Sequence, residues 1–150
     1  MRNSYREEGD YAVHISTRCR YAIKALVRLA LSYGGPPVQS RDIAVFGAIP
    51  AKYLEQVMHD LRQGGLVTST RGKNGGYVLA LPPDAISFAQ VREIVDGPLS
   101  DPERMPRAGQ ADALVEPVWH DVRQAVREVL AGATIGAAAE RARSTPTYAI

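Results

Sequence analysis

Cysteine is nearly absent from the sequence: among 150 residues only Cys19 carries a thiol. One thiol cannot form a disulfide within the chain, and it cannot supply the thiolates of the usual zinc or iron–sulfur frameworks. The three histidines, His14, His59 and His120, are far apart and lack the spacing of metal ligands. We therefore expect no metal and no cofactor bound by a familiar ligand motif.

Long apolar runs are also missing. No stretch approaches the roughly 18 apolar residues that a membrane span needs, and the first residues lack the apolar core of a signal peptide. The composition, 45% hydrophobic and 23% charged, is ordinary for a soluble globular chain. We expect a cytoplasmic protein with no membrane partner.

Arrangements typical of enzymes are not found either. The carboxylates form no acid–base pair, and the sequence contains no nucleophile elbow and no phosphate-binding loop. The glycines of 72–76 join two predicted strands and do not open a helix, so they are not such a loop. We expect no catalytic activity.

Charge is distributed unevenly along the chain. Residues 11–81 hold nine Lys or Arg against three Asp or Glu, a net charge of +6, whereas 82–150 holds seven against ten, a net charge of −3. A basic first half indicates a module that binds a polyanion, joined to a part with another task. A chance distribution is the alternative.

Apolar spacing and turn residues predict helices and a small hairpin in the first half. We expect a helix from Ser16 or Thr17 to about Tyr33, a short helix over 41–46 capped by Ser40, and a third helix from Pro50 to Gly64. Gly47 is expected to make the turn before Pro50. Two strands, 66–70 and 77–81, would follow.

The second half is predicted to be helical. Ser87 and Gln90 form a capping box for a helix that ends at Gly97, and a polar loop follows. Over 114–131 apolar residues recur every three or four positions, and such a stripe needs a partner. The residues of the stripe are Val115, Val118, Trp119, Val122, Val126 and Val129. A last helix, capped by Thr134, is expected over 135–142. Trp119 is expected to anchor a dimer core, with an adjacent effector pocket as the alternative.

This order of elements, two helices, a turn, a third helix and a charged hairpin, is the layout of a winged helix-turn-helix. The fold class is therefore mainly α with a small β-hairpin wing and a long C-terminal dimerisation helix. On the third helix, Lys52 could reach a phosphate or a guanine and Gln56 could pair with adenine. In the wing, glycines separate Arg71 and Lys73, and Asn74 tolerates the left-handed conformation. The alternative is a plain glycine-rich hairpin with two solvated cations.

The predicted contacts to double-stranded DNA fall into three groups. We expect Arg18, Ser40 and Arg41 to hold the backbone, Lys52, Tyr53 and Gln56 to face the major groove, and Arg71, Lys73 and Asn74 to form the wing.

Several short motifs resemble the Rrf-two family of bacterial transcriptional regulators, which includes IscR-, NsrR- and CymR-like proteins. The strongest are Tyr-Leu-Glu-Gln at 53–56 and Arg-Gly-x-x-Gly-Gly-Tyr at 71–77, and the resemblance covers about 13–142. It implies a homodimer in which the helix carrying Trp119 crosses the other subunit and two recognition helices meet a roughly palindromic operator. We expect this dimer to act as a repressor.

The sequence also departs from this family. Many members hold an iron–sulfur cluster through three cysteines in the loop before the long helix, and the corresponding segment here, 96–118, has none. Cluster-free members, which respond to partner proteins, small molecules or thiol oxidation, are the better guide to its effector. Two alternatives are an atypical metal or cluster sensor that uses Cys19 and His120, and a winged-helix module that binds proteins.

Cys19 itself allows two interpretations. It lies in the first turn of a predicted helix between Arg18 and Arg20, where the helix dipole and two cations would favour the thiolate and a redox switch. Alternatively it is a small packing residue, at a position where the family often has glycine.

We divide the chain into five parts: an N-terminal extension (1–12) ahead of an alternative start at Val13, the winged helix-turn-helix domain (13–97), a flexible loop (98–113), dimerisation helices (114–143) and a tail (144–150).

Overall fold

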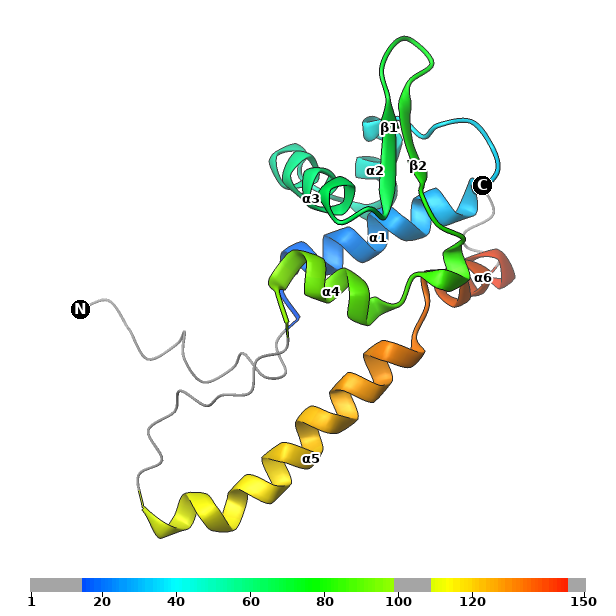
Figure 1. Cartoon of the computed structure of the whole chain (residues 1–150). Helices are drawn as coiled ribbons and strands as arrows, with labels where there is room; N and C mark the ends of the chain where they lie inside the picture. The colour runs from blue at the N-terminus through cyan, green and yellow to red at the C-terminus, as the bar shows by residue number, and fades with distance from the viewer. Residues whose placement is uncertain (1–14, 99–108, 146–150) are drawn as a thin grey trace, which may run out of the picture.

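The computed structural model describes residues 15–98 and 109–145. In order, its elements are α1 (Thr17–Leu31), α2 (Ser40–Gly47), α3 (Ala51–Gln63), β1 (Val67–Thr70), β2 (Gly76–Leu79), the 3₁₀ turn η2 (Pro83–Ala85), α4 (Phe88–Asp96), α5 (Gln110–Gly132) and α6 (Ile135–Ser144) (Figure 1). This confirms a mainly helical fold with one hairpin. The proposed N-terminal extension and the greater part of the loop and of the tail lie outside the described residues.

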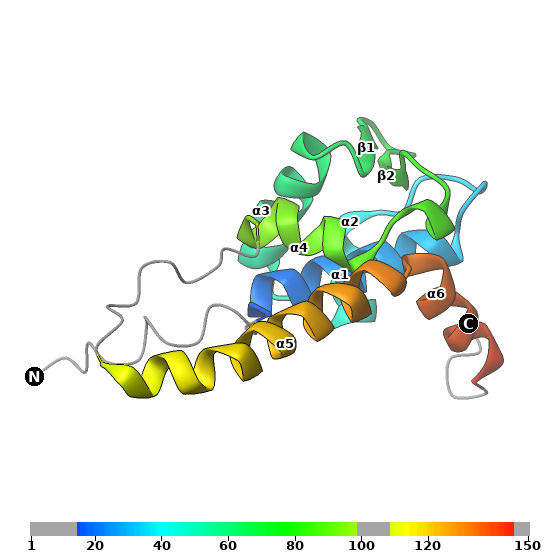
Figure 2. The same ribbon diagram turned by 60° about the horizontal axis from the view of Figure 1, so that its bottom comes forward.

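Helix α1 forms the centre of the domain. It begins at its N-cap Ser16, whose Oγ accepts a hydrogen bond from the Cys19 backbone amide at 3.0 Å. Small buried residues such as Ala22 and Ala25 allow other helices to approach closely, and α2, α3, α4 and α6 all contact α1 (Figures 1 and 2). The first helix thus becomes the common support of the domain.

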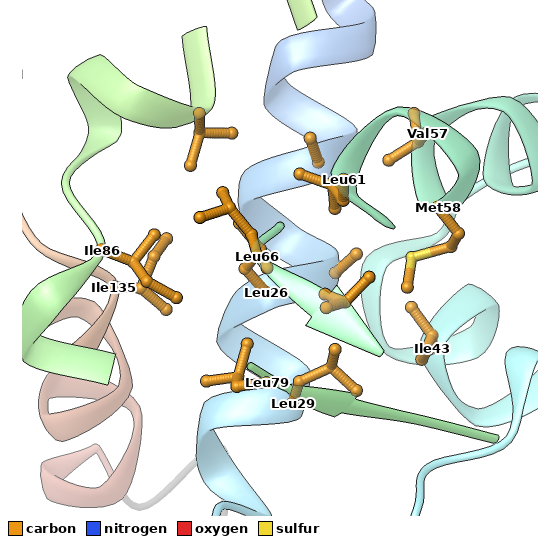
Figure 3. Close-up of a cluster of buried hydrophobic side chains, with 14 of the residues drawn as sticks. Leu26, Leu29, Ile43, Val57, Met58, Leu61, Leu66, Leu79, Ile86 and Ile135 are labelled. Atoms are coloured by element: carbon orange, nitrogen blue, oxygen red, sulfur yellow. The ribbon is translucent and has the colours of Figure 1, made fainter. Parts of the chain in front are cut away.

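The hydrophobic core draws on both halves of the sequence. Leu26 of α1 packs with Met58 and Leu61 of α3, and Ile86 and Ile135 join the same cluster from the second half (Figure 3). Burying a side chain of this size contributes about 1.5–3 kcal/mol. The C-terminal helix α6 is therefore part of the same hydrophobic core as α1 and α3, although it follows the long helix α5 in the sequence.

The turn between α2 and α3 differs from the prediction. The left-handed residue is Ala48, with φ 49° and ψ 48°, and Gly47 is the last residue of α2. Gly47 is needed for space, because a Cβ there would lie 2.7 Å from Ile49 Cδ1. The predicted helix starts are also shifted. Gln39, not Ser40, is the N-cap of α2, so Ser40 is its first residue, and Pro50, which was predicted to lie in the first turn of α3, is its N-cap.

The hairpin is shorter than predicted and gains a third segment. Val67 pairs with Leu79 and Thr70 with Gly76 in antiparallel register. Val38, which precedes α2, exchanges two backbone hydrogen bonds with Tyr77, of 2.9 and 2.8 Å. The wing is thereby attached to the chain segment that enters the helix-turn-helix.

In the second half the predicted caps are present. The Ser87 amide donates to Gln90 Oε1 at 2.8 Å, the Gln90 amide donates to Ser87 Oγ at 3.1 Å, and Thr134 caps α6. Helix α5 begins at Gln110, earlier than the predicted 114. The prediction missed the first turn because that turn lacks the large apolar residues on which the prediction relied. The N-terminal half of α5 projects away from the domain (Figure 1). Within the described residues, no helix is both long and apolar enough to span a bilayer.

Candidate nucleic-acid interface

Helix α3 has one buried face and one exposed face. The buried residues are Leu54, Val57, Met58 and Leu61, and the exposed residues include Lys52, Glu55, Gln56 and His59. Lys52 and Gln56 lie one helical turn apart on the exposed side, as predicted. Their amine and amide are free to meet phosphates or base edges.

Tyr53, which was predicted to face the groove, is half-buried. Its ring packs against that of Tyr21 on α1, with 5.7 Å between the ring centroids and 45° between the planes. Lys52 Nζ lies 4.9 Å from the centre of the Tyr53 ring. Tyr53 therefore fixes the start of α3 on α1 and helps to orient Lys52. Tyr21 escaped the sequence reasoning because no local pattern reveals an aromatic pair between two helices.

The wing tip presents Arg71, Lys73 and Asn74 to solvent, as predicted. The left-handed conformation that Asn74 would tolerate is not used there: the positive φ angles of the hairpin are at Gly72, 110°, and Gly76, 153°. Glycine has no Cβ to clash in that region, so it takes these positions in preference to asparagine.

A polar cleft lies between the start of α2 and the wing. Its lining residues are Gln39, Ser40, Arg62, Ser69, Thr70, Arg71, Gly72, Gly75, Gly76 and Tyr77. Ser40 and Arg41 are exposed in the first turn of α2, where backbone amides favour an anion. Arg62, which sequence reasoning missed, donates from Nη1 to Ser69 Oγ at 3.3 Å and joins α3 to β1. Its place three residues after the exposed His59 was an available signal.

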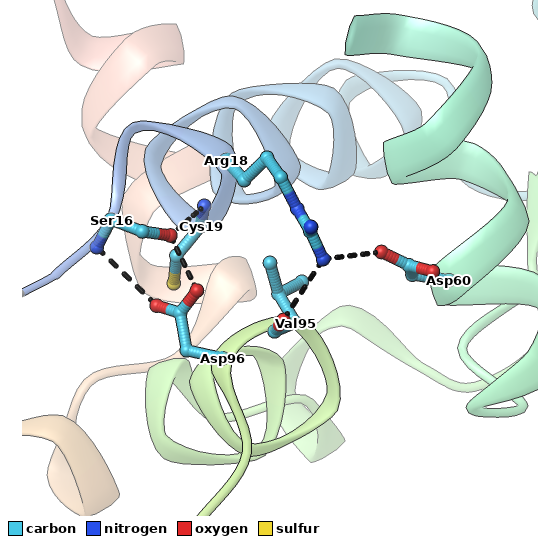
Figure 4. Close-up of polar contacts among 6 residues, drawn as sticks. All are labelled: Ser16, Arg18, Cys19, Asp60, Val95 and Asp96. Carbon is cyan, nitrogen blue, oxygen red and sulfur yellow. Dashed lines mark hydrogen bonds and ion pairs between the residues drawn. The ribbon is translucent and has the colours of Figure 1, made fainter.

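Arg18, which was predicted to hold the DNA backbone, has hydrogen-bond partners within the domain. Its Nη2 donates to Asp60 Oδ2 of α3 at 3.0 Å and to the Val95 carbonyl of α4 at 3.1 Å (Figure 4). The guanidinium is thus bound between three helices, an arrangement that the sequence position alone could not reveal.

Cys19 is fully buried next to the same contacts. Burial, together with a smaller contribution from the Asp96 carboxylate, raises the pKa of its thiol to about 11, although Arg92 and Arg20 act in the opposite direction. The expectation that neighbouring cations favour the thiolate is therefore wrong, because loss of solvation outweighs their attraction. The packing interpretation of Cys19 agrees with this burial.

The predicted stripe on α5 is largely open to solvent. Val115, Val118, Trp119, Val122 and Val129 are exposed, Trp119 at 53% and Val129 at 69%, while Val126 is partly buried. Leu114 extends the stripe at 80% exposure. The face beside it, with Arg123 and Leu130, is buried and lies where α5 packs on α4.

A helix-turn-helix followed by a wing with a basic tip defines the winged helix-turn-helix class of DNA-binding proteins. A model of the Rrf2 family, described as an iron-dependent transcriptional regulator, matches residues 15–141. The chain belongs to this family and is a DNA-binding transcriptional regulator, not an enzyme.

Named relatives and solved structures agree with this assignment. The HTH-type transcriptional regulator CymR of Bacillus subtilis is 37% identical over 121 residues, covering 81% of this chain and 86% of that protein. IscR of Aliivibrio salmonicida is 33% identical over 125 residues, covering 81% and 74%. The structure of B. subtilis CymR, called the global cysteine regulator of that bacterium, superposes with a TM-score of 0.76, covering 85% of this chain and 97% of CymR. T. potens IscR gives a TM-score of 0.69 at 28% identity, covering 91% and 92%.

The residues of this chain do not fit the cysteine-ligated cluster associated with many family members. The single cysteine lies buried in α1, so one chain cannot provide three thiolates. His120 is exposed on α5, and the described residues contain no group of three or more His, Cys, Asp or Glu suited to a metal ion. The pairing of Cys19 with His120 thus finds no support in the geometry.

Proposed function

We propose that the protein binds a roughly palindromic operator as a homodimer, with α3 in the major groove and the wing against the adjacent backbone. The observation that carries the proposal is the exposed side of α3, where Lys52 and Gln56 stand one turn apart opposite a fully packed core face. An exposed amide on a recognition helix pairs well with adenine, and a lysine reaches guanine or phosphate. Sequence would be read mainly by these two residues.

Backbone contacts would come from two sides of the polar cleft. Ser40 and Arg41 at the start of α2 supply amides and a guanidinium, while Arg71 and Lys73 supply cations from the wing. Asn74 adds an uncharged donor at the tip. Such contacts fix position and orientation and contribute to affinity for any sequence.

The dimer would form through the exposed stripe of α5. Contiguous apolar surface of this kind usually marks a protein–protein contact, and the projecting half of α5 has no partner helix within the described part of the chain (Figure 1). Half-sites one helical turn apart would require the two α3 helices of the dimer to lie about 34–36 Å apart. Occupying such an operator would repress the adjacent promoter, and an effector or partner protein would relieve this through a route that uses no cysteine-bound cluster.

The test starts with selection of genomic fragments by the purified chain, which should enrich a palindromic motif. On the recovered site, Lys73→Ala should weaken binding to every sequence and lower the slope of log affinity against log salt by about 0.9. Gln56→Ala should instead relax the preference at one base pair, by about 1–3 kcal/mol. Titrations across single-base operator variants separate the two behaviours. The assignment fails if both variants lose affinity uniformly, or if no motif is enriched.

A further inference from the structure

The N-terminus of α1 meets the end of α4 and the flank of α3 in one hydrogen-bonded cluster, formed by Ser16, Arg18, Asp60, Val95 and Asp96 (Figure 4). Three helices that are distant in sequence are connected there by side-chain contacts. Apart from Arg18, none of its residues is among those assigned above to DNA contact.

Arg18 is the member that touches all three helices. It belongs to α1, and its Nη2 atom donates both to Asp60 Oδ2 of α3 and to the Val95 carbonyl of α4. The side chains of Arg18 and Asp60 are 36% and 22% exposed, so the pair is partly shielded from water and geometrically constrained. A partly shielded guanidinium that donates to two helices at once fixes their relative positions more effectively than an exposed ion pair does.

The α4 side of the cluster is fixed independently of Arg18. Ser16 Oγ donates to Asp96 Oδ1 at 2.5 Å and the Ser16 amide donates to Asp96 Oδ2 at 3.3 Å. These bonds hold the last turn of α4 against the start of α1. The Val95 carbonyl is therefore fixed in position, and its hydrogen bond to the Arg18 guanidinium orients that group toward Asp60.

Asp60 lies one helical turn beyond Gln56 on α3. A rotation or tilt of α3 that breaks the bond to Arg18 would therefore also move the Gln56 amide relative to a base edge. We propose that Arg18, acting through Asp60, is a positioning residue that sets the orientation of the recognition helix and thereby sequence specificity. This inference rests on the proposed docking of α3 in the major groove.

The experiment is a double-mutant cycle of Arg18→Ala and Asp60→Ala in the full chain, with Arg20→Ala as the matched control. Arg20 is an exposed arginine on the same helix, and its Nε donates only locally, to the Ile15 carbonyl at 3.4 Å. Binding is measured on two probes, a duplex carrying the strongest site recovered by genomic selection and a shuffled duplex of the same composition, over a range of salt.

Each single variant of the pair should lose about tenfold in affinity for the operator, and the double variant should lose little more, because both remove the same contact. Affinity for the shuffled duplex and the salt slope should stay at wild-type values for Arg18→Ala. Asp60→Asn, which keeps an acceptor for the guanidinium, should restore most of the operator preference. Arg20→Ala should keep the ratio of operator to shuffled affinity.

Two results would overturn the inference. A salt slope lowered by about 0.9 in Arg18→Ala, with equal losses on both duplexes, would identify Arg18 as a phosphate contact. Additive losses in the double variant would show that Arg18 does not act through Asp60. If an alanine variant is too unstable to titrate, the Asp60→Asn protein decides, and loss of most of its operator preference would overturn the inference. If wild-type protein prefers neither duplex, the proposed function itself fails.

Discussion

At the scale of single residues, Cys19 shows how burial overrides a favourable local charge. Its sequence neighbours are two arginines, yet the side chain lies inside the domain beside Asp96, and its thiol pKa is raised to about 11. A thiol that stays protonated is a weak nucleophile and reacts slowly with oxidants. The residue contributes packing to α1.

The raised pKa of Cys19 makes stability depend on pH in alkaline solution. In the unfolded chain the thiol ionises near its ordinary value of 9.0, whereas in the folded protein it keeps its proton until about pH 11. Above pH 9 the unfolded state therefore binds fewer protons, so the free energy of unfolding falls as pH rises. We expect wild type to lose up to about 2 kcal/mol relative to Cys19→Ala between pH 8 and 11.

Urea unfolding of both proteins across this pH range measures the difference, and the comparison cancels the titration of lysines and tyrosines. A difference that is constant with pH would contradict the burial of the thiol.

At the scale of elements, the wing depends on glycine at its turn. A Cβ on Gly75 would collide with the Thr70 carbonyl oxygen and lie 2.9 Å from the Arg71 carbonyl carbon, and backbone atoms cannot move aside as a flexible side chain could. A Cβ on the neighbouring Gly76 would likewise collide with the Val38 carbonyl oxygen. The tip that carries Arg71 and Lys73 is held in place by this close backbone contact.

Gly75→Ala should open the hairpin turn, destabilise the domain by about 1–3 kcal/mol and weaken DNA binding by displacing the wing cations. Gly132→Ala is the control, since a Cβ at that position meets nothing within 4 Å. Thermal unfolding and operator titration of the two variants provide the measurement. Equal behaviour of both variants would mean that the turn tolerates a side chain.

At the scale of the whole molecule, two surfaces lie on different elements. In the proposed complex, the exposed cations of α2, α3 and the wing would contact the nucleic acid, and the apolar stripe of α5 would contact a second copy of the chain. Since a palindromic site is bound by both copies at once, dimerisation and operator affinity should fall together.

Val122→Asp places a charge within the stripe and should shift the protein from dimer to monomer, with operator affinity falling at least tenfold. Gln124→Asp is the matched control, because Gln124 is exposed on the opposite side of α5. Sedimentation equilibrium gives the oligomeric state and titration gives the affinity. A Val122→Asp protein that stays dimeric would exclude the stripe as the contact.

Much of the site was predictable because its signals are local. The spacing of Leu54, Val57, Met58 and Leu61 defines which side of α3 is buried and so leaves Lys52 and Gln56 outside. The Ser87 capping box is likewise contained within four residues. By contrast, we predicted the turn between α2 and α3 at Gly47, because glycine is the usual residue in a left-handed turn. In the structure Ala48 is the left-handed residue, and Gly47 is needed because a Cβ there would clash with Ile49.

The sequence by itself determined the order of helices and hairpin, the basic character of the first half and the lack of a three-cysteine ligand set, because periodicity, charge and composition are properties of neighbours along the chain. Only the tertiary structure decided that Arg18 binds Asp60 and Val95, that Tyr53 packs on Tyr21 and that Cys19 is a buried thiol. Each of these depends on helices brought together by folding, and the solvation and partners of a side chain are fixed only there.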